Sequence, residues 1–364
     1  MSDRTLHQSG QLMARNCINL KFLLPILLLT PFCLASGGCA SLPWEPLIAR
    51  KAELTCPPPP LPPKAEYLGE IRGFQQTGVS LSSLLFGRRE GKILQPVAIA
   101  IAKDGRIAIA DWKRKGVHLF LPDQKKYLFL YKAEKDQEIQ SPVSVAFGNM
   151  ELYVSDSALQ KVLVYDRNGT FLKSIDGVGT QPFGRPTGLS FQENGGLLHV
   201  ADTTRNCIHV FDIDHGHVRS IGSRGAGIGG LNFPTSIALD SRGRLFINDT
   251  MNFRVQIYDP GKGFVAAFGR HGDGSGDFAM PKGLAVDRWG VIYVADSLFD
   301  AVQLFDQSGH FLLTIGSQGT GAGEFWMPSG LFIDDRDRLY VCDTYNGRIQ
   351  IFQLYDFTVE ADRS

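Results

Sequence analysis

Residues 281–296 read PKGLAVDRWGVIYVAD. The stretch begins with a proline, continues with two β-rich runs on either side of the turn residues Asp-Arg-Trp-Gly, and ends with an aspartate. Alternating runs rich in β-branched and aromatic residues, bounded by turn residues, are typical of short strands joined in a hairpin. The stretch therefore predicts two antiparallel strands, and the rest of the chain shows how often this unit is used.

The same unit occurs six times between residue 93 and the C-terminal region. Its prolines are spaced by 44 to 48 residues, and each is followed 14 to 16 residues later by an aspartate. A third and usually a fourth alternating run complete each repeat, as in VQLFDQSG and GHFLLTIG. The prolines are Pro96, Pro142, Pro186, Pro234, Pro281 and Pro328, and the aspartates are Asp111, Asp156, Asp202, Asp249, Asp296 and Asp343. Four short strands per repeat of this length predict an all-β, six-bladed β-propeller of four-stranded blades over residues 65–364.

The last repeat lacks its own fourth strand, because RIQIFQL (348–354) is followed by YDFTVEADRS. The segment EYLGEIRG (66–73) matches the fourth-strand segment TFLKSIDG (170–177). We expect this N-terminal strand to complete the sixth blade and close the ring, since a free edge strand would invite aggregation. Residues 74–92 then form an enlarged loop into the first blade.

The segment GAGIGG (225–230) satisfies the G-x-G-x-x-G pattern of a dinucleotide-binding turn. Glycines recur at equivalent distances before Pro186, Pro281 and Pro328, and no helix is expected to follow them. The segment is therefore one copy of a loop that joins an outer strand to the next blade, where glycine allows positive φ. This excludes a dinucleotide site.

The repeats PKGLAVDRWGVIYVADS and DTYNGRIQIF resemble NHL repeats, a family of six-bladed propellers. The D-T-x-N-x-R signature of the family is complete twice, as Asp249-Thr250-Asn252-Arg254 and Asp343-Thr344-Asn346-Arg348. The resemblance implies a binding propeller, and NHL relatives that bind RNA use strongly basic faces. Other relatives by fold are metal-dependent lyases or lactonases. The formal net charge here is +0, which argues against nucleic-acid binding.

The N-terminal region has the order of a signal peptide, which we assign to residues 1–38. Basic residues precede the apolar run FLLPILLLTPFCLA, and SGGCAS follows it. Gly37-Gly38-Cys39 resembles the bacterial lipoprotein box, so Cys39 is the expected lipidation site. An ordinary secretory signal and an uncleaved anchor are the alternatives. Residues 39–64, which include CPPPPLPPK (56–64), are expected to be a proline-rich tether between the membrane and the propeller.

The sequence offers no set of residues with the spacing of a catalytic or metal site. The six repeat aspartates recur at strand ends, which favours structural turn capping over a ring of acids. A metal site in the channel needs three or more converging ligands, whereas the inner strands carry mainly small residues. Cys207 and Cys342 belong to distant blades, so no disulfide is expected between them. We therefore expect no catalytic residue, metal or cofactor.

Topology places the glycine-rich joining loops and the segments after the repeat aspartates on one face of the ring, which we call the glycine-loop face. On it we expect a group of cations and tryptophans that suits a protein partner or an acidic ligand. This group comprises Arg88, Arg89, Lys92, Trp112, Lys113, Arg114, Lys115 and Trp326. The alternative is a solvated pair of loops without a partner.

Together these features predict a lipid-anchored, extracytoplasmic NHL-type propeller that serves as a non-catalytic protein-binding scaffold in a bacterial cell envelope. Its partner would be another envelope protein or an acidic ligand, and the lipid anchor would hold it to a membrane. The alternatives are a hydrolase, lactonase or lyase with a metal site on the glycine-loop face, and a ring that supports a larger envelope complex.

Overall fold

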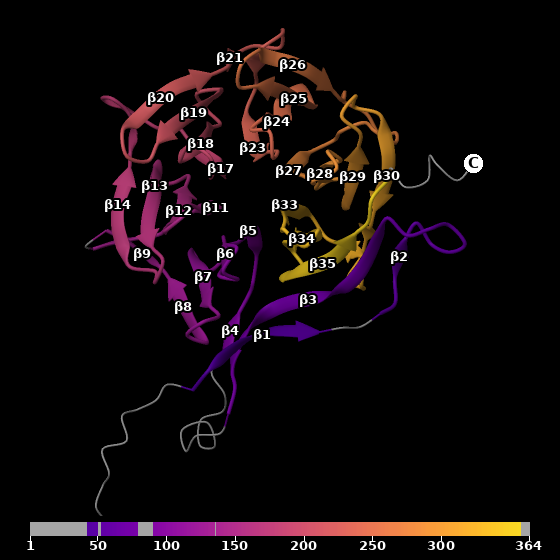
Figure 1. Ribbon diagram of the computed structural model, residues 1–364, viewed down its shortest axis with the longest axis horizontal. Coiled ribbons are helices and arrows are strands. Elements are labelled where there is room, and N and C mark those ends of the chain that lie inside the picture. Colours follow the sequence, from indigo (N-terminus) through magenta and orange to yellow (C-terminus); the bar gives the residue numbers. More distant parts are fainter. Residues whose placement is uncertain (1–41, 50–51, 79–89, 135, 358–364) are drawn as a thin grey trace, which may run out of the picture. The chain divides into compact units, whose positions relative to one another are not determined.

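The computed structural model describes residues 42–49, 52–78, 90–134 and 136–357, which belong to the unit Leu42–Ser364. The described residues of this unit form strands and one 3-10 helix, η1 (Thr250–Asn252). Among the residues described, no helix is long and apolar enough to cross a membrane. Figure 1 shows the strands as small sheets arranged in a ring around a common centre. The predicted six-bladed propeller is confirmed.

Blades 1 to 5 are four-stranded antiparallel sheets whose strands follow chain order from the centre outward. Blade 1 comprises β5 (Pro96–Ile101), β6 (Ile107–Asp111), β7 (Gly116–Leu121) and β8 (Lys126–Leu130). Blade 2 comprises β11 (Pro142–Phe147), β12 (Glu151–Asp156), β13 (Lys161–Asp166) and β14 (Phe171–Ile175). Blade 3 comprises β17 (Pro186–Gln192), β18 (Leu197–Asp202), β19 (Cys207–Asp212) and β20 (Gly216–Ile221).

Blades 4 and 5 repeat this arrangement, and blade 6 begins with three strands in the same order. Blade 4 comprises β23 (Pro234–Leu239), β24 (Leu245–Asp249), β25 (Arg254–Asp259) and β26 (Gly263–Phe268). Blade 5 comprises β27 (Pro281–Val286), β28 (Ile292–Asp296), β29 (Ala301–Phe305) and β30 (Phe311–Ile315). Blade 6 starts with β33 (Pro328–Ile333), β34 (Arg338–Asp343) and β35 (Arg348–Leu354).

The repeat proline and the repeat aspartate are register partners in every blade, as in Pro281 opposite Asp296. A β-bulge follows each proline, so the inner strand bends where it begins. Bulges re-aim the residues next to them. In all six blades the regular pairing of the inner strand is therefore interrupted directly after the proline. This interruption lies at the end of the ring that carries the joining loops.

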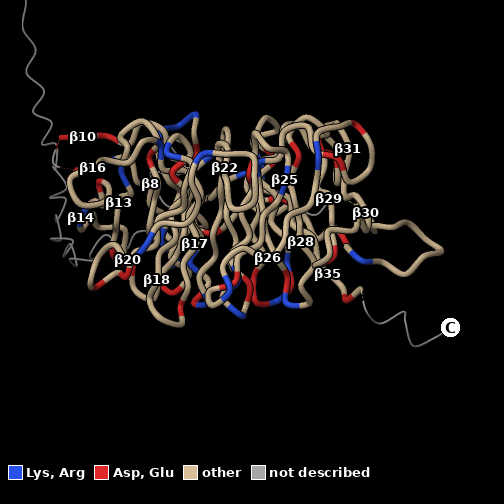
Figure 2. Tube along the Cα trace, turned by 90° about the horizontal axis from the view of Figure 1, so that it is seen from above, with Lys and Arg blue, Asp and Glu red and all other residues tan. Residues whose placement is uncertain are grey.

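The joining loops contain short two- and three-residue strands. These strands are β9 (Lys132–Glu134), β10 (Gln137–Glu138), β15 (Gly177–Val178), β16 (Gln181–Pro182), β21 (Ser223–Arg224), β22 (Gly230–Leu231), β31 (Ser317–Gln318) and β32 (Glu324–Phe325). Figure 2 shows β10, β16, β22 and β31 along one edge of the ring, which is the glycine-loop face.

The hydrophobic core is divided into six clusters, and each cluster lies between two neighbouring blades. Leu152 and Val154 of blade 2, for example, pack with Ala108 and Val117 of blade 1. The sheets therefore bury both of their faces, which explains why the middle strands are apolar at nearly every position. Every blade needs both neighbours, so the ring must close for its core to be complete.

Closure is achieved by β3 (Ala65–Gln76), which pairs antiparallel with β35 and completes blade 6. The predicted closing segment 66–73 lies inside this strand, so the prediction is confirmed. The strand also reaches beyond blade 6, because Phe74 stacks on Phe120 of blade 1 with ring centroids 5.6 Å apart. The short β4 (Glu90–Lys92) forms the last residues of the expected first-blade loop and pairs with the end of β3, where that loop begins. Residues 79–89 of that loop lie outside the described part.

The segment 39–64 differs from the expected tether. Two of its parts, β1 (Trp44–Ala49) and β2 (Thr55–Cys56), pair antiparallel with β3 and extend the sheet of blade 6. Trp44 packs on Tyr127 of blade 1 with ring centroids 4.9 Å apart, and the Cys56 thiol donates to the carbonyl oxygen of Thr314. These contacts bury apolar groups that a solvated spacer would leave in water. Part of the expected tether therefore belongs to the folded unit.

Candidate functional site

The glycine-loop face is fixed by the six repeat aspartates, which are fully buried. In every blade the residue two positions before the inner-strand proline donates its backbone N–H to the aspartate, over 2.6 to 2.8 Å. Several of these carboxylates also accept N–H bonds from the turn that follows them, as Asp156 does from Ala158 and Leu159. Each aspartate thus ties the end of the second strand to the incoming loop and has no free face for chemistry.

The complete D-T-x-N-x-R signatures hold the glycine-rich loops. In blade 4, Arg254 donates to the carbonyl oxygens of Gly227 and Gly230, and Asn252 donates to that of Gly225. The carbonyl groups of GAGIGG are therefore bound by side chains of the same chain, and Gly229 has a φ of +73°. A dinucleotide turn offers backbone N–H groups at a helix N-terminus. This loop leads directly into a strand instead.

A hydroxyl group directly after the aspartate joins one blade to the next in four places. Thr203, Thr250, Ser297 and Thr344 donate to the carbonyl oxygens of Pro234, Pro281, Pro328 and Pro96. The last of these bonds links blade 6 back to blade 1. Trp112 occupies the corresponding position in blade 1 and is 53% exposed. Blade 1 thus presents a large aromatic side chain where four other blades use a short hydroxyl.

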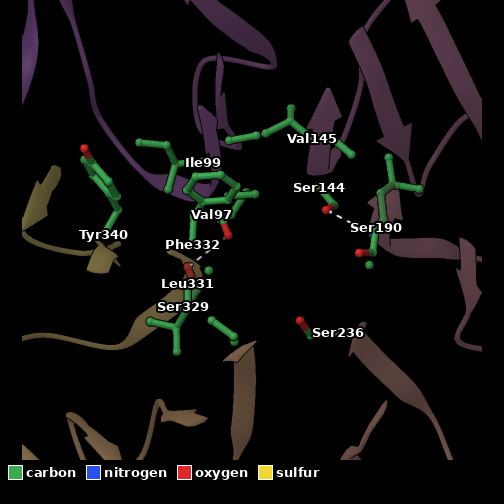
Figure 3. Close-up of a pocket in the computed structure, with 18 of the residues that line it drawn as sticks. Val97, Ile99, Ser144, Val145, Ser190, Ser236, Ser329, Leu331, Phe332 and Tyr340 are labelled. Atoms are coloured by element: carbon green, nitrogen blue, oxygen red, sulfur yellow. Dashed lines mark hydrogen bonds between the residues drawn. The ribbon is translucent and has the colours of Figure 1, made fainter. Parts of the chain in front are cut away.

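The inner strands of all six blades line one central cavity of about 1190 Å³. Its wall combines apolar side chains with serine hydroxyls, and Figure 3 shows how several of them are arranged. Ser144 accepts the N–H of Leu189, and Ser329 donates to the carbonyl oxygen of Val97. The cavity exceeds the usual size of a small-molecule pocket, which is roughly 300 to 1,000 Å³.

Apolar residues gather where this cavity opens on the glycine-loop face, which we call the mouth. Trp112, Phe233, Met251 and Tyr345 line the cavity there, and Trp112, Met251 and Tyr345 are each more than half exposed. Trp326, 48% exposed, packs on Tyr345 with ring centroids 5.4 Å apart. Single exposed apolar side chains are common, but a group of them on one surface favours a ligand or a partner.

Two of the apolar residues at the mouth have a strained backbone. Phe233 has a φ of 54° and Met327 a φ of 53°, which is uncommon for bulky side chains. A side chain from a turn of the preceding blade binds each of them. The backbone N–H of Phe233 donates to the Asn206 side chain, and that of Met327 donates to the Asp300 side chain. Strain of this kind persists only where the surroundings impose it, and it concentrates at functional sites.

Arg185 and Lys282 place two positive charges at the mouth. Both are exposed and both line the cavity, Arg185 before blade 3 and Lys282 on the inner strand of blade 5. Among the described residues, neither side chain has a hydrogen-bond or ion-pair partner. Desolvation at the mouth lowers the pKa of Lys282 from its ordinary value, and the positive charge of Arg185 lowers it further. The mouth is thus electropositive.

The other end of the cavity is different in character. Lys103 of blade 1 and Glu193 of blade 3 line it and form an ion pair with each other. Asp334 and Arg338 of blade 6 also pair at this end. Several charges at this end are therefore paired within the chain, whereas the side chains of Arg185 and Lys282 at the mouth are not.

The predicted group of cations and tryptophans is only partly assembled as a binding surface. Trp112 is at the mouth, and Lys92, Lys113 and Lys115 are exposed. Arg114 instead packs over the ring of Phe129 at 4.4 Å and donates to the carbonyl oxygen of Lys92. It holds the loop against blade 1 and is not a free cation. Arg88, Arg89 and the lipidation candidate Cys39 lie outside the described residues.

Sequence reasoning missed Arg185 and Lys282, although the repeat contains a signal for them. Arg185 is the only charged residue directly before an inner-strand proline, where the other repeats have Gln, Ser, Phe or Met. Lys282 is the only charged residue directly after one, where the others have Val, Thr or Ser. Comparing the repeats at these two positions would have identified both.

The structure shows no metal-binding arrangement in the part it describes. No group of three or more His, Cys, Asp and Glu residues there could hold a metal ion, and the lining of the cavity contains no histidine or cysteine. His118 and His199 are buried within the blades. His118 lies between Asp111 and the Tyr127 hydroxyl, at 3.2 and 2.9 Å. Cys56, Cys207 and Cys342 are free thiols.

Residues 288–363 match a family described as a 6-bladed beta-propeller. No curated protein matches the sequence.

Solved structures of similar fold include enzymes and a binding protein. Virginiamycin B lyase from Staphylococcus aureus is 15% identical, with a TM-score of 0.53 over 72% of this chain and 95% of that one. A gluconolactonase from Xanthomonas campestris is 13% identical, with a TM-score of 0.53 over 72% of this chain and 87% of that one. An auxiliary nutrient binding protein from Bacteroides thetaiotaomicron is 11% identical, with a TM-score of 0.55 over 71% of this chain and 69% of that one. At these identities the likeness extends to the fold alone, and the chain is a six-bladed β-propeller.

Proposed function

We propose that this protein is a lipid-anchored, extracytoplasmic NHL-type propeller that binds a partner protein of the bacterial cell envelope without catalysis. The partner surface is the glycine-loop face around the mouth. The observation that carries this proposal is the gathering of exposed Trp112, Met251, Trp326 and Tyr345 on one face. Aromatic, Met and Arg residues are enriched in protein interfaces, and a central cluster of them supplies most of the binding energy.

The buried polar groups of the same face support a binding role over a catalytic one. The aspartates, Asn252 and Arg254 are all engaged by backbone groups or by each other. They fix the loops that present the exposed side chains and leave no activated nucleophile or base among the residues described. A rigid scaffold that displays apolar side chains reduces the entropy lost on binding.

A metal-dependent hydrolase, lactonase or lyase is the alternative, because propellers with these activities share the fold. One structure of the related lyase is a catalytically inactive variant with a histidine replaced by alanine, solved with Quinupristin. The cavity lining of the present chain has no histidine among the described residues. Metal analysis of the purified protein, with turnover assays before and after chelation, tests this alternative directly.

The cellular location in the proposal is supported by the N-terminal sequence alone. The apolar run followed by Gly37-Gly38-Cys39 supports export and lipidation. The segment between Cys39 and β3 contributes two strands to the sheet of blade 6, so a lipid on Cys39 would hold the folded unit near the membrane surface.

The proposal is tested by cross-linking in intact cells with two matched double variants. Trp112→Ala/Tyr345→Ala removes aromatic groups from the mouth, while Met150→Ala/Leu172→Ala removes exposed apolar groups away from the mouth. We expect one envelope protein, identified by mass spectrometry, to be captured by the wild type and the second variant and to be missing from the first. Equal capture by all three proteins would contradict the proposal.

A further inference from the structure

The mouth carries two positive charges in addition to its exposed apolar side chains. Arg185 and Lys282 come from blades 3 and 5, so they flank the start of blade 4. Phe233 and Thr235 lie between them in the ring order, and all four residues line the cavity. Two like charges set together without a counter-charge are unfavourable, so this arrangement favours an anion between them.

Several other cations of the propeller are paired within the chain. Arg254 and Arg348 are bound to aspartates and carbonyl oxygens, and Arg244 pairs with Asp240. At the far end of the cavity, Lys103 pairs with Glu193. Among the described residues of the cavity wall, the exposed cations without a side-chain partner are Arg185 and Lys282 at the mouth and Arg336 at the far end, so the mouth is the place where two such cations from different blades occur.

The wall below the two cations is mainly apolar. Val97, Val145, Leu189, Ile237 and Leu331 line the cavity, and the hydroxyls of Ser144 and Ser329 are already used by backbone groups. Phe233 is held at the mouth with a positive φ beside the position where the anion would lie. A ligand that contacts both regions therefore needs an apolar part against this wall and a negatively charged group at the mouth.

We propose that the mouth binds a small amphipathic organic anion, with its charged head between Arg185 and Lys282 and its apolar body in the central cavity. Carboxylate and phosphate heads share the required chemistry. Arginine binds either of them with two parallel N–H donors, and lysine adds a point charge. The site does not depend on the proposed protein partner, because every group it uses comes from this chain.

The test is calorimetric titration of the full chain, purified from membranes into zwitterionic lipid nanodiscs, with empty nanodiscs as the blank. The probes are 3-phenylpropanoate, 2-phenylethyl phosphate, the neutral 3-phenylpropanamide, and acetate, which lacks the apolar body. We expect at least one of the two amphipathic anions to bind, and the tighter of them identifies the head group. The amide and acetate should bind at least about tenfold more weakly, since each lacks one half of the required chemistry.

Arg185→Gln/Lys282→Gln should weaken binding of the preferred anion by about a hundredfold, because each charge-assisted hydrogen bond to the anion strengthens binding by about tenfold. Lys173→Gln/Lys262→Gln is the matched control, because it removes two positive charges from exposed positions that do not line the cavity. The control should retain affinity. Binding of the amide as tight as that of the anions, an equal decrease in both variants, or no binding of either anion would overturn the proposal. Partner capture in cells is a separate measurement, so failure here leaves the protein-binding proposal open to its own test.

Discussion

The buried ion pair between Glu70 and Arg348 offers a direct test of how the ring is closed. Glu70 is on the closing strand β3, and its carboxylate lies 2.7 Å from Nη1 of Arg348 on β35. Arg348 also contacts Asp343 at 2.7 Å through Nε, and both partners of the Glu70 pair have side chains that are almost completely buried. The change Glu70→Gln keeps the shape of the side chain and removes its charge.

The expected decrease in stability is about 3 kcal/mol. Removing one partner of a buried ion pair costs about 3–5 kcal/mol, because the other charge is left without compensation. In the variant, Arg348 still donates to Asp343 and to two carbonyl oxygens, and the glutamine oxygen can still accept a hydrogen bond. We therefore expect a decrease at the lower end of this range. Arg72, the second partner of Glu70, is 41% exposed and adds little.

The assay is urea unfolding at pH 7, with Glu66→Gln as the matched control. Glu66 is on the same strand, but its carboxylate is exposed and accepts a hydrogen bond from the Tyr355 hydroxyl. The control should change the free energy of unfolding by less than about 0.5 kcal/mol.

The pH dependence gives a second check on the same variant. Burial alone would raise the pKa of Glu70, but hydrogen bonds and the charges of Arg72 and Arg348 hold it below its ordinary value. A carboxyl group with a depressed folded-state pKa stabilises the protein above its unfolded pKa, near 4.3, and loses this contribution as the pH falls through the folded-state value. The difference between wild type and Glu70→Gln should therefore be full at pH 7 and shrink below about pH 4. A difference no larger than that of Glu66→Gln, or one that grows in acid, would show that the buried Glu70–Arg348 pair does not stabilise the closed ring.

Three further changes test other parts of the account. Ser297→Ala removes the buried hydroxyl that donates to the Pro328 carbonyl oxygen and should lower the free energy of unfolding by about 1–3 kcal/mol, measured in urea; no change would show that this inter-blade bond is dispensable. Lys115→Gly replaces an exposed residue with a φ of 52° and should raise the free energy of unfolding by about 0.5–1 kcal/mol, seen as a slightly higher melting temperature; a lower melting temperature would contradict this backbone conformation. Cys39→Ser should abolish lipid labelling and move the protein out of the membrane fraction after cell fractionation, whereas unchanged labelling and membrane association would exclude Cys39 as the lipidation site.

The fold could be predicted because each blade repeats the same physical pattern. The spacing from Pro281 to Asp296 fixes the length of a hairpin, and the two residues are partners in the structure. The missing fourth strand of the last repeat could be found because residues 66–73 carry the alternation of a fourth strand. The pairing of β1 could not be found in this way, since its position depends on Trp44 meeting Tyr127 of another blade.

The candidate site was harder to predict because it depends on residues that depart from the repeat. Trp112 was recognised as an exposed aromatic residue next to a run of charges. Arg114 belongs to the same run, yet it packs on Phe129, which no local pattern reveals. Arg185 and Lys282 stand as single charges within otherwise regular strands and loops. Comparing the repeats distinguishes both residues, but their shared position at one cavity follows from the ring, which brings the starts of blades 3, 4 and 5 together.

In the proposed function, the glycine-loop face is the surface that meets the partner. The most direct measurement is photo-cross-linking in living cells, with a photoreactive amino acid in place of Trp112 at the mouth or in place of Met150 away from it. We expect a defined cross-linked product with one envelope protein from position 112 and none from position 150. Products of equal yield from both positions, or a product from position 150 alone, would contradict this expectation.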